Sequence, residues 1–282
     1  MPAPPLLPVL ALDTATETIA AGLHAGGAAF APGAPGDGVF TLSAPGGETF
    51  TLSAPGGEAF TLSAPGGARA STQLLPLLSS LLARAGLQWR DLRAIAYGQG
   101  PGAFTGLRTA CAVAQGLGYG IGCRLLPLDS LLIVAEDARE QAAAPAGCEV
   151  AVAVDARMDE AYAARYRWLG GRWQVLQAPA LYTLPALNAA WSGASAQGLV
   201  AGSALAAFGN RLSLPARWQR VEPEQNRAAA LLRLAHRAAL DGSGVEPADA
   251  LPLYLRDKVA LTTAERAVIK ALATAVPGGS LR

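Results

Sequence analysis

The stretch that decides the fold of this chain reads VLALDTATET and spans Val9–Thr18. Its first four residues are apolar, which is typical of a short buried strand, and the strand ends at Asp13 in a small polar turn. The apolar run Ile19–Leu23 follows and predicts a returning strand. In the second half, Val150–Asp155 and Ala161–Tyr166 flank another polar turn in the same order. Two copies of strand, aspartate turn and strand indicate a protein built from two related halves.

The first turn carries groups that suit a phosphate and its magnesium ion. Backbone N–H groups and hydroxyls can hold phosphate oxygens, and a carboxylate is a hard ligand for magnesium. The candidate phosphate-turn residues are Asp13, Thr14, Thr16 and Thr18. Any β-hairpin can carry Asp-Thr at its turn, so a purely structural turn is an alternative. The second turn adds Asp159 and Glu160, whose charges would repel phosphate. We therefore expect a nucleotide site that is weakened or lost, with the first turn as its vestige.

Hairpins of this kind open each half of the actin-like ATPases, which include sugar kinases and heat-shock ATPases. We therefore expect an α/β protein of the actin-like (ASKHA, ribonuclease H-like) fold with two related lobes. The first lobe would span residues 1–127 and the second residues 128–282. Near the end, Asn226–Leu240 predicts an amphipathic helix and Leu251–Tyr254 a short strand. The last helix of the second lobe could pack back on the first lobe.

The composition narrows the class of protein. The chain has 282 residues, is 51% hydrophobic and 15% charged, and carries a net charge of +1. We expect no membrane-spanning helix and no signal peptide, because no apolar run is long enough and the start lacks basic residues. The small net charge argues against a protein that grips nucleic acid unaided. Cys111, Cys123 and Cys148 lack metal-binding spacing, and we interpret them as reduced thiols of a cytoplasmic protein.

A low-complexity insert at about residues 31–67 contains a ten-residue unit three times. The copies begin at Phe40, Phe50 and Phe60, and each offers a short FTLS strand followed by a Pro-Gly-Gly turn. We interpret the insert as a tandem duplication that lengthened one hairpin or loop. The alternative is a partner-binding or aggregation-prone β segment, a risk that the prolines and glycines would blunt.

Two predicted helices lie on either side of a glycine-rich loop. Leucines at three- and four-residue steps predict a helix over Ser71–Ala85. The loop Gly98–Gly106 follows a short strand, and Thr105 is the expected cap of a second, small-residue helix over Gly106–Gly120. The loop lacks both the Gly-Lys-Ser/Thr of a P-loop and the glycine spacing of a dinucleotide site. A structural loop and a ligand-binding loop both remain open.

Four segments of the chain resemble the TsaB (YeaZ) family and occur in the family's order. They are LALDTATET at 10–18, GPGAFTGLR at 100–108, DARMDEAY at 155–162 and PLYLR at 252–256. The second segment looks like a loop that TsaB shares with its catalytic relative TsaD. The resemblance covers the chain except for the repeat insert, which departs from the family pattern. An insert that folded over the two predicted helices would put their pairing surface in doubt.

The resemblance implies a non-catalytic subunit that forms a heterodimer with TsaD and is joined by the ATPase subunit TsaE. That complex transfers a threonylcarbamoyl group from its adenylate to the adenosine beside the tRNA anticodon, so this chain would meet tRNA only through the complex. The resemblance implies no tightly bound cofactor in the isolated chain, with a place for ATP or ADP and magnesium in the assembled complex. The two predicted helices would pair with TsaD, or with a second copy of the chain in its absence. The expected interface residues are Leu74, Leu75, Leu78, Leu82, Arg108, Ala110, Cys111 and Ala114. The alternative is that both helices only cover the sheet.

The sequence suggests neither catalytic residues nor a metal site. TsaD holds a metal through a His-x-x-x-His pair, and the corresponding segment Leu128–Glu136 contains no histidine. The two histidines, His24 and His236, are too far apart in the sequence to suggest a metal centre. Two other classes of protein remain as alternatives. One is an independent ATP-dependent kinase or transferase of the actin-like fold, and the other is a metallopeptidase-like or metal-dependent catalyst.

Overall fold

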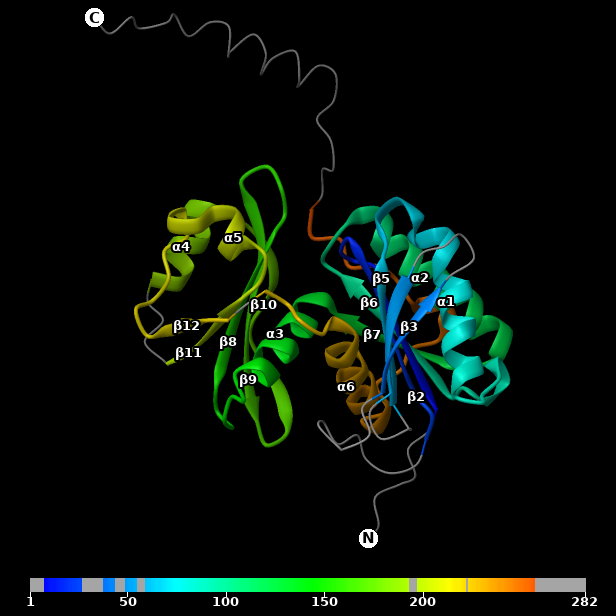
Figure 1. The fold of residues 1–282 in the computed structure, drawn as a ribbon. Coiled ribbons are helices and arrows are strands. Elements are labelled where there is room, and N and C mark those ends of the chain that lie inside the picture. Colours follow the sequence, from blue (N-terminus) through cyan, green and yellow to red (C-terminus); the bar gives the residue numbers. More distant parts are fainter. Residues whose placement is uncertain are drawn as a thin grey trace, which may run out of the picture.

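The computed structural model describes residues 8–26, 38–43, 49–54, 59–192, 197–221 and 223–256. Parts of the predicted insert and the outer ends of both predicted lobes therefore lie outside the described residues. Within these ranges the chain forms two sheets with helices on their faces, and α3 and α6 lie in the region between the sheets (Figure 1).

The first sheet takes its strands from the first half of the chain. Among the described residues its order is β3 (Gly38–Ser43), β4 (Thr49–Ala54), β5 (Ala59–Pro65), β2 (Thr18–His24), β1 (Val9–Asp13), β6 (Ala94–Gly100) and β7 (Arg124–Asp129). β1 pairs antiparallel with β2, as the opening stretch predicts, and parallel with β6. Each repeat copy supplies one strand, so the duplication widened this sheet at one edge.

Both faces of the central strand β1 are covered, because its side chains point alternately to the two faces of the sheet. Leu10 and Leu12 pack beneath α1 (Ala70–Arg84) and α2 (Phe104–Ile121). Val9 and Ala11 pack on the other face against α6 (Arg227–Leu240), a helix from the second half of the chain. The full burial of β1 explains why its sequence is a continuous apolar run rather than an alternating one.

The second sheet has the order β10 (Arg172–Thr183), β9 (Glu160–Leu169), β8 (Glu149–Asp155), β11 (Gly198–Ala201) and β12 (Trp218–Arg220) among the described residues. α3 (Ser130–Gln141) packs on one face, while α4 (Leu184–Ser192) and α5 (Ala204–Phe208) pack on the other. The antiparallel pair β8–β9 repeats the β1–β2 hairpin. The fold is therefore α/β with two related halves, as the repeated hairpin predicts.

Two local predictions are wrong. Thr105 does not cap α2, because the helix begins at Phe104 and Ala103 occupies the cap position without a side-chain hydrogen bond. Leu251–Tyr254 does not form a strand; the Leu253 N–H donates to the Gln99 carbonyl at 2.6 Å, and no ladder follows. The helices α1 and α6 begin and end within a residue of their expected limits.

Candidate functional site

The two hairpin turns and the glycine-rich loop face one another in a cleft between the sheets. A cavity of about 590 Å³ in this cleft is lined by Thr16, Gly102, Glu224 and Arg227, among others. A neighbouring cavity of about 730 Å³ shares Thr16 and Gly102, and is lined as well by the second turn and residues 253–256. The structure thus brings together the three motifs that the sequence singles out.

The Asp13 carboxylate at the end of β1 is committed to a buried ion pair. Asp13 is fully buried, and its Oδ2 accepts a hydrogen bond from Arg227 Nε at 2.6 Å. The same guanidinium donates from Nη1 to Glu224 Oε1 at 2.8 Å. Burial disfavours the charged guanidinium, but Asp13 and Glu224 outweigh that effect and raise the pKa of Arg227. The Asp13 carboxylate is therefore already paired with a cation of the protein itself.

The threonines of the first turn also form hydrogen bonds within the protein. Thr14 is buried, and its hydroxyl donates to the Gly106 carbonyl at 2.7 Å. The Thr18 N–H donates to Thr16 Oγ1 at 3.2 Å, which closes the turn on itself. Asp13 and Thr14 do not line the two cavities, because both are bonded within the protein, to Arg227 and to the glycine-rich loop. The vestigial phosphate turn stays a prediction. Thr16 and Thr18 remain at the cleft.

Two positions of the glycine-rich loop have no room for a side chain, because the first turn packs closely against them. A Cβ atom at Gly98 would lie 1.8 Å from Asp13 Oδ1, and one at Gly106 would lie 1.8 Å from the Thr14 carbonyl oxygen. The Ala103 N–H also donates to the Ala15 carbonyl at 2.8 Å. These contacts favour the structural interpretation of the loop, since its glycines admit the first turn rather than a ligand.

The second turn has an unusual backbone. Arg157, Met158 and Asp159 have φ angles of 64°, 59° and 59°, a left-handed region that costs about 1–2 kcal/mol for each non-glycine residue. Arg256 stabilises the turn from the far end of the chain, since its Nη2 donates to the Ala156 carbonyl at 2.9 Å and lies 2.7 Å from Glu160 Oε2. The turn and the C-terminal segment therefore close one side of the cleft together.

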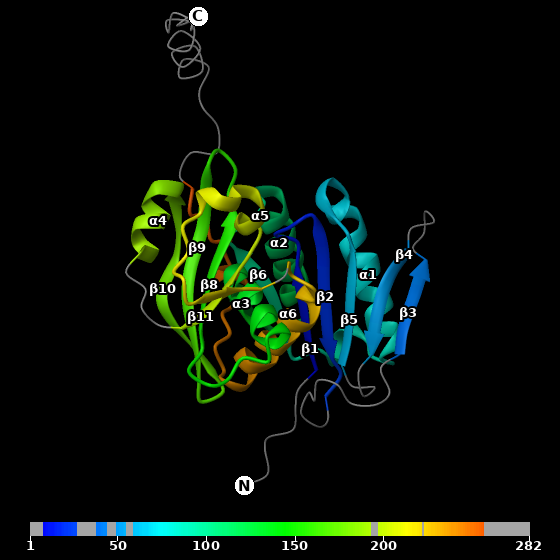
Figure 2. The same cartoon turned by 60° about the vertical axis from the view of Figure 1, so that its left-hand side comes forward.

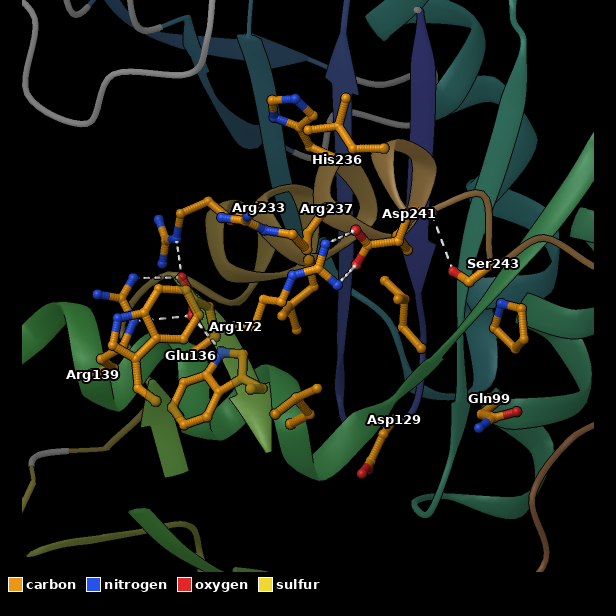
Figure 3. Close-up of a pocket in the computed structure, with 18 of the residues that line it drawn as sticks. Gln99, Asp129, Glu136, Arg139, Arg172, Arg233, His236, Arg237, Asp241 and Ser243 are labelled. Carbon is orange, nitrogen blue, oxygen red and sulfur yellow. Dashed lines mark hydrogen bonds and ion pairs between the residues drawn. The ribbon is translucent and has the colours of Figure 1, made fainter. Parts of the chain in front are cut away.

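A separate cavity of about 670 Å³ lies between α3, α6 and the β9–β10 hairpin, and a buried carboxylate joins its walls (Figure 3). Glu136 of α3 is 2% exposed and accepts hydrogen bonds from Arg233 Nε at 2.6 Å, Arg139 Nη2 at 2.9 Å and Trp173 Nε1 at 2.9 Å. Burial acts to raise the pKa of Glu136, but the bonds and charges of the two arginines outweigh it and lower this pKa. The Arg172 guanidinium donates two hydrogen bonds to the Asp241 carboxylate, one from Nη1 and one from Nη2. We call Glu136, Arg139, Trp173 and Arg233 the interlobe clasp, because they link β10 of the second sheet to α6 on the first.

Most of the predicted interface residues do not reach the surface. The buried ones, all in the core beneath α1 and α2, are Leu74, Leu78, Leu82, Ala110, Cys111 and Ala114. These six assignments are corrected, since a side chain packed on its own sheet is not available to a partner. Leu75 is 43% exposed, and Arg108 is exposed with its guanidinium 3.8 Å from the centre of the Phe104 ring.

The exposed face of α2 is rotated from the predicted one, and after Arg108 its members are small or apolar. It presents Ala112, Gly116, Tyr119 and Gly120, with Tyr119 64% exposed. We call these four residues, together with Leu75 of α1, the α1–α2 face. Ala112, Gly116 and Gly120 recur at a helical spacing of four residues, so the sequence does show this small-residue stripe. Nothing in the sequence showed whether this stripe or the one with Ala110 and Ala114 would face outward.

The two histidines illustrate a contact that the sequence did not suggest. His24 of β2 and His236 of α6 have ring centroids 5.1 Å apart, because α6 packs on β2. Among the described residues no group of three or more histidine, cysteine or acidic side chains is placed to hold a metal ion. In the same part of the chain no helix is both long and apolar enough to cross a membrane.

Comparisons with known proteins identify the family of the chain. The family model described as "TsaD: tRNA N6-adenosine threonylcarbamoyltransferase" matches residues 67–231, more than half of the chain. The chain is 39% identical over 90 residues to the "tRNA threonylcarbamoyladenosine biosynthesis protein TsaB" of Haemophilus influenzae, and 38% identical over 100 residues to that of Escherichia coli. These matches cover 32% and 35% of this chain, and 37% and 42% of the two relatives, so they span less than half of either.

A solved structure extends the match to nearly the whole chain. YeaZ from Pseudomonas aeruginosa superposes with a TM-score of 0.68 at 30% sequence identity, covering 89% of this chain and 100% of that one. The alignment supports the predicted actin-like fold of two related lobes. The chain belongs to the TsaB (YeaZ) family.

Proposed function

We propose that this protein is the non-catalytic dimerisation subunit of a tRNA threonylcarbamoyladenosine-forming complex. In this role it would support TsaD in the threonylcarbamoylation of the adenosine beside the anticodon. The names of the curated TsaB relatives support a part in tRNA threonylcarbamoyladenosine biosynthesis. The observation that carries the non-catalytic role is the pairing of Asp13 with Arg227, since the acid that a catalyst of this fold would turn toward magnesium is neutralised inside the protein.

The interlobe clasp gives a second argument for a scaffold. Catalysts with two lobes around a cleft commonly open and close around their ligand. Here a buried carboxylate with three donors holds α3, α6 and β10 together, and removing one partner of such a group is costly. A rigid pair of lobes suits a subunit whose work is to present a surface to a partner.

The α1–α2 face is the surface that we assign to TsaD. A Cβ atom added at Gly116 or Gly120 would meet nothing within 4 Å, so neither glycine is needed for packing inside the chain. By contrast, one added at Gly118 would lie 2.9 Å from Leu125 Cδ2. Each helical glycine costs about 1 kcal/mol relative to alanine. Exposed glycines beside Ala112 and Tyr119 are explained if a helix of a partner packs closely there.

The rest of the assembly follows from the same role. We propose that TsaE joins the heterodimer, and that ATP or ADP and magnesium act in the complex rather than in a tight site of the isolated chain. The net charge of +1 favours contact with tRNA only through the complex, because unaided binding to phosphates needs a strong basic excess. The chemistry and partners described here suit a protein of the cytoplasm.

Co-purification with TsaD tests the assigned surface. The variant Ala112→Arg places a long charged side chain on the α1–α2 face, and Ala190→Arg makes the same change at an exposed alanine of α4. We expect Ala112→Arg to lose TsaD during co-purification and Ala190→Arg to retain it, with both variants melting like the unmodified protein. Equal retention of TsaD by the two variants would show that the partner binds elsewhere.

A further inference from the structure

The tandem repeat, which the proposed function leaves unexplained, forms a sheet out of copies of itself. β3, β4 and β5 each contain the FTLS segment of one ten-residue copy, and Figure 2 shows them side by side at the outer end of the first sheet. β3 pairs antiparallel with β4 with Thr41 opposite Thr51, and β4 pairs antiparallel with β5 with Leu52 opposite Leu62. The sequence FTLS therefore pairs with its own copy twice within one chain.

The outer edge of β3 has the same pairing chemistry and no neighbour among the described strands. β3 stands at the end of the sheet order and, of the strands that the structure describes, pairs with β4 alone. Its six residues read GVFTLS, with neither a charged residue nor a proline inside the strand. Natural sheets commonly protect an edge with lysine, proline or a bulge, because an unprotected row of N–H and C=O groups accepts another strand.

The opposite edge of this sheet is already occupied in part. Leu125 of β7 and Val245 exchange two backbone hydrogen bonds, of 3.0 Å and 2.7 Å, in an isolated antiparallel bridge. A new strand could therefore add beyond β3 more readily than beyond β7. Two β3 edges that pair with each other are both satisfied, so this contact closes a pair of chains rather than starting a growing fibre.

We propose that the outer edge of β3 binds β3 of a second copy of this chain, which joins the two first sheets into one across a two-fold axis. The occupant is a second copy because the strand that FTLS pairs with, twice in this structure, is another FTLS strand running antiparallel. An antiparallel pairing of identical strands is two-fold symmetric, so both chains satisfy their edges at once. Such strand addition gains its affinity from main-chain hydrogen bonds.

This pairing uses a surface different from the one that we assign to TsaD. α2 packs over β1 and β6, and β3 lies three strands beyond β2 at the edge of the sheet. A dimer through β3 would therefore leave the α1–α2 face of each copy open. The β3 pairing therefore does not depend on the proposed contact with TsaD.

Sedimentation velocity of the full chain, without TsaD, tests the proposal by measuring how charged residues introduced into β3 change the number of chains that sediment together. We expect the unmodified protein to sediment as two chains. The double variant Thr41→Lys with Ser43→Lys should sediment as one chain, and so should Thr41→Glu with Ser43→Glu, because like charges face each other across the axis. Mixing the two variants should restore the mass of two chains, a rescue that a damaged fold could not produce.

Two controls separate this surface from the alternatives. Ala189→Lys with Ala190→Lys adds the same charge to the exposed side of α4 and should leave the dimer unchanged. The proposal is overturned if the unmodified protein sediments as one chain, if the lysine variant stays dimeric, or if the mixture stays monomeric. A dimer that is lost in Ala112→Arg instead would place the contact on the α1–α2 face. Hydrogen exchange gives a readout without variants: the amides of 38–43 should gain protection as the protein concentration rises, and unchanged protection would contradict the pairing.

Discussion

Replacing Gly116 with alanine should make the isolated protein more stable and its complex with TsaD weaker. The added Cβ meets nothing within 4 Å in the isolated chain, and the position lies inside α2 without a left-handed backbone. Helix propensity alone then acts, and it favours alanine by about 1 kcal/mol, which corresponds to a rise in melting temperature of about 2–4 °C. At a close crossing of two helices the same methyl group must displace the partner, and we expect the affinity for TsaD to fall about tenfold, equal to about 1.4 kcal/mol.

Two measurements and one matched variant check that the substitution raises stability while it lowers the affinity for TsaD. Denaturant unfolding of the isolated chain gives the stability, and titration calorimetry with TsaD gives the affinity. Gly118→Ala is the control on the same helix, because its Cβ would lie 2.9 Å from Leu125 Cδ2 and 3.0 Å from Pro247 Cγ. That variant should lose stability. A Gly116→Ala protein that is stabilised but binds TsaD as tightly as before would refute the assigned interface, and one that is destabilised would refute the exposed placement of Gly116.

Further predictions concern the buried groups. Asp13→Asn leaves Arg227 short of a charge partner and should lower the free energy of unfolding by about 3 kcal/mol, whereas Arg157→Gln, which removes an exposed ion pair to Asp155, should cost less than about 1 kcal/mol in denaturant titrations. Glu136 has a pKa lowered by folding, so its contribution to stability is present at neutral pH and is lost as the pH falls through that pKa. Between about pH 5 and pH 3 the free energy of unfolding should therefore fall more steeply for the unmodified protein than for Glu136→Gln. Parallel curves of the two proteins would contradict the stabilising role of the interlobe clasp. Leu78→Ala should cost about 3 kcal/mol and Leu75→Ala less than about 1 kcal/mol, since only Leu78 is in the core; similar costs would contradict the orientation of α1.

The elements that the sequence predicted well are those set by local patterns. The apolar run before Asp13, bounded by a polar turn, predicted the buried strand β1, and the leucine spacing predicted the limits of α1 to within a residue. The turn after Asp155 was placed by the same pattern of strand and polar turn. Periodicity of this kind carries its information in neighbouring residues, so it can be read without knowledge of the tertiary structure.

The orientation of the helices and the partners of the acids could not be predicted. On an alanine-rich helix such as α2, Ala112 and Ala114 have the same chemistry, and only docking on the sheet decided that Ala114 faces the core. Arg227 reaches Asp13 from 214 positions away, and no local feature of the sequence marks either as the other's partner. A phosphate turn and an internal ion pair use the same aspartate, so the sequence alone could not separate them.

The most direct test of the non-catalytic role is reconstitution with purified components. TsaD, TsaE, ATP, magnesium, the threonylcarbamoyl adenylate and unmodified tRNA would be incubated with and without this chain, and the modified nucleoside would be measured by mass spectrometry. We predict efficient transfer only when this chain and TsaD are both present, and full transfer when the chain carries Thr16→Ala with Thr18→Ala at the cleft. Transfer by this chain without TsaD, or transfer by TsaD that is indifferent to this chain, would contradict the account.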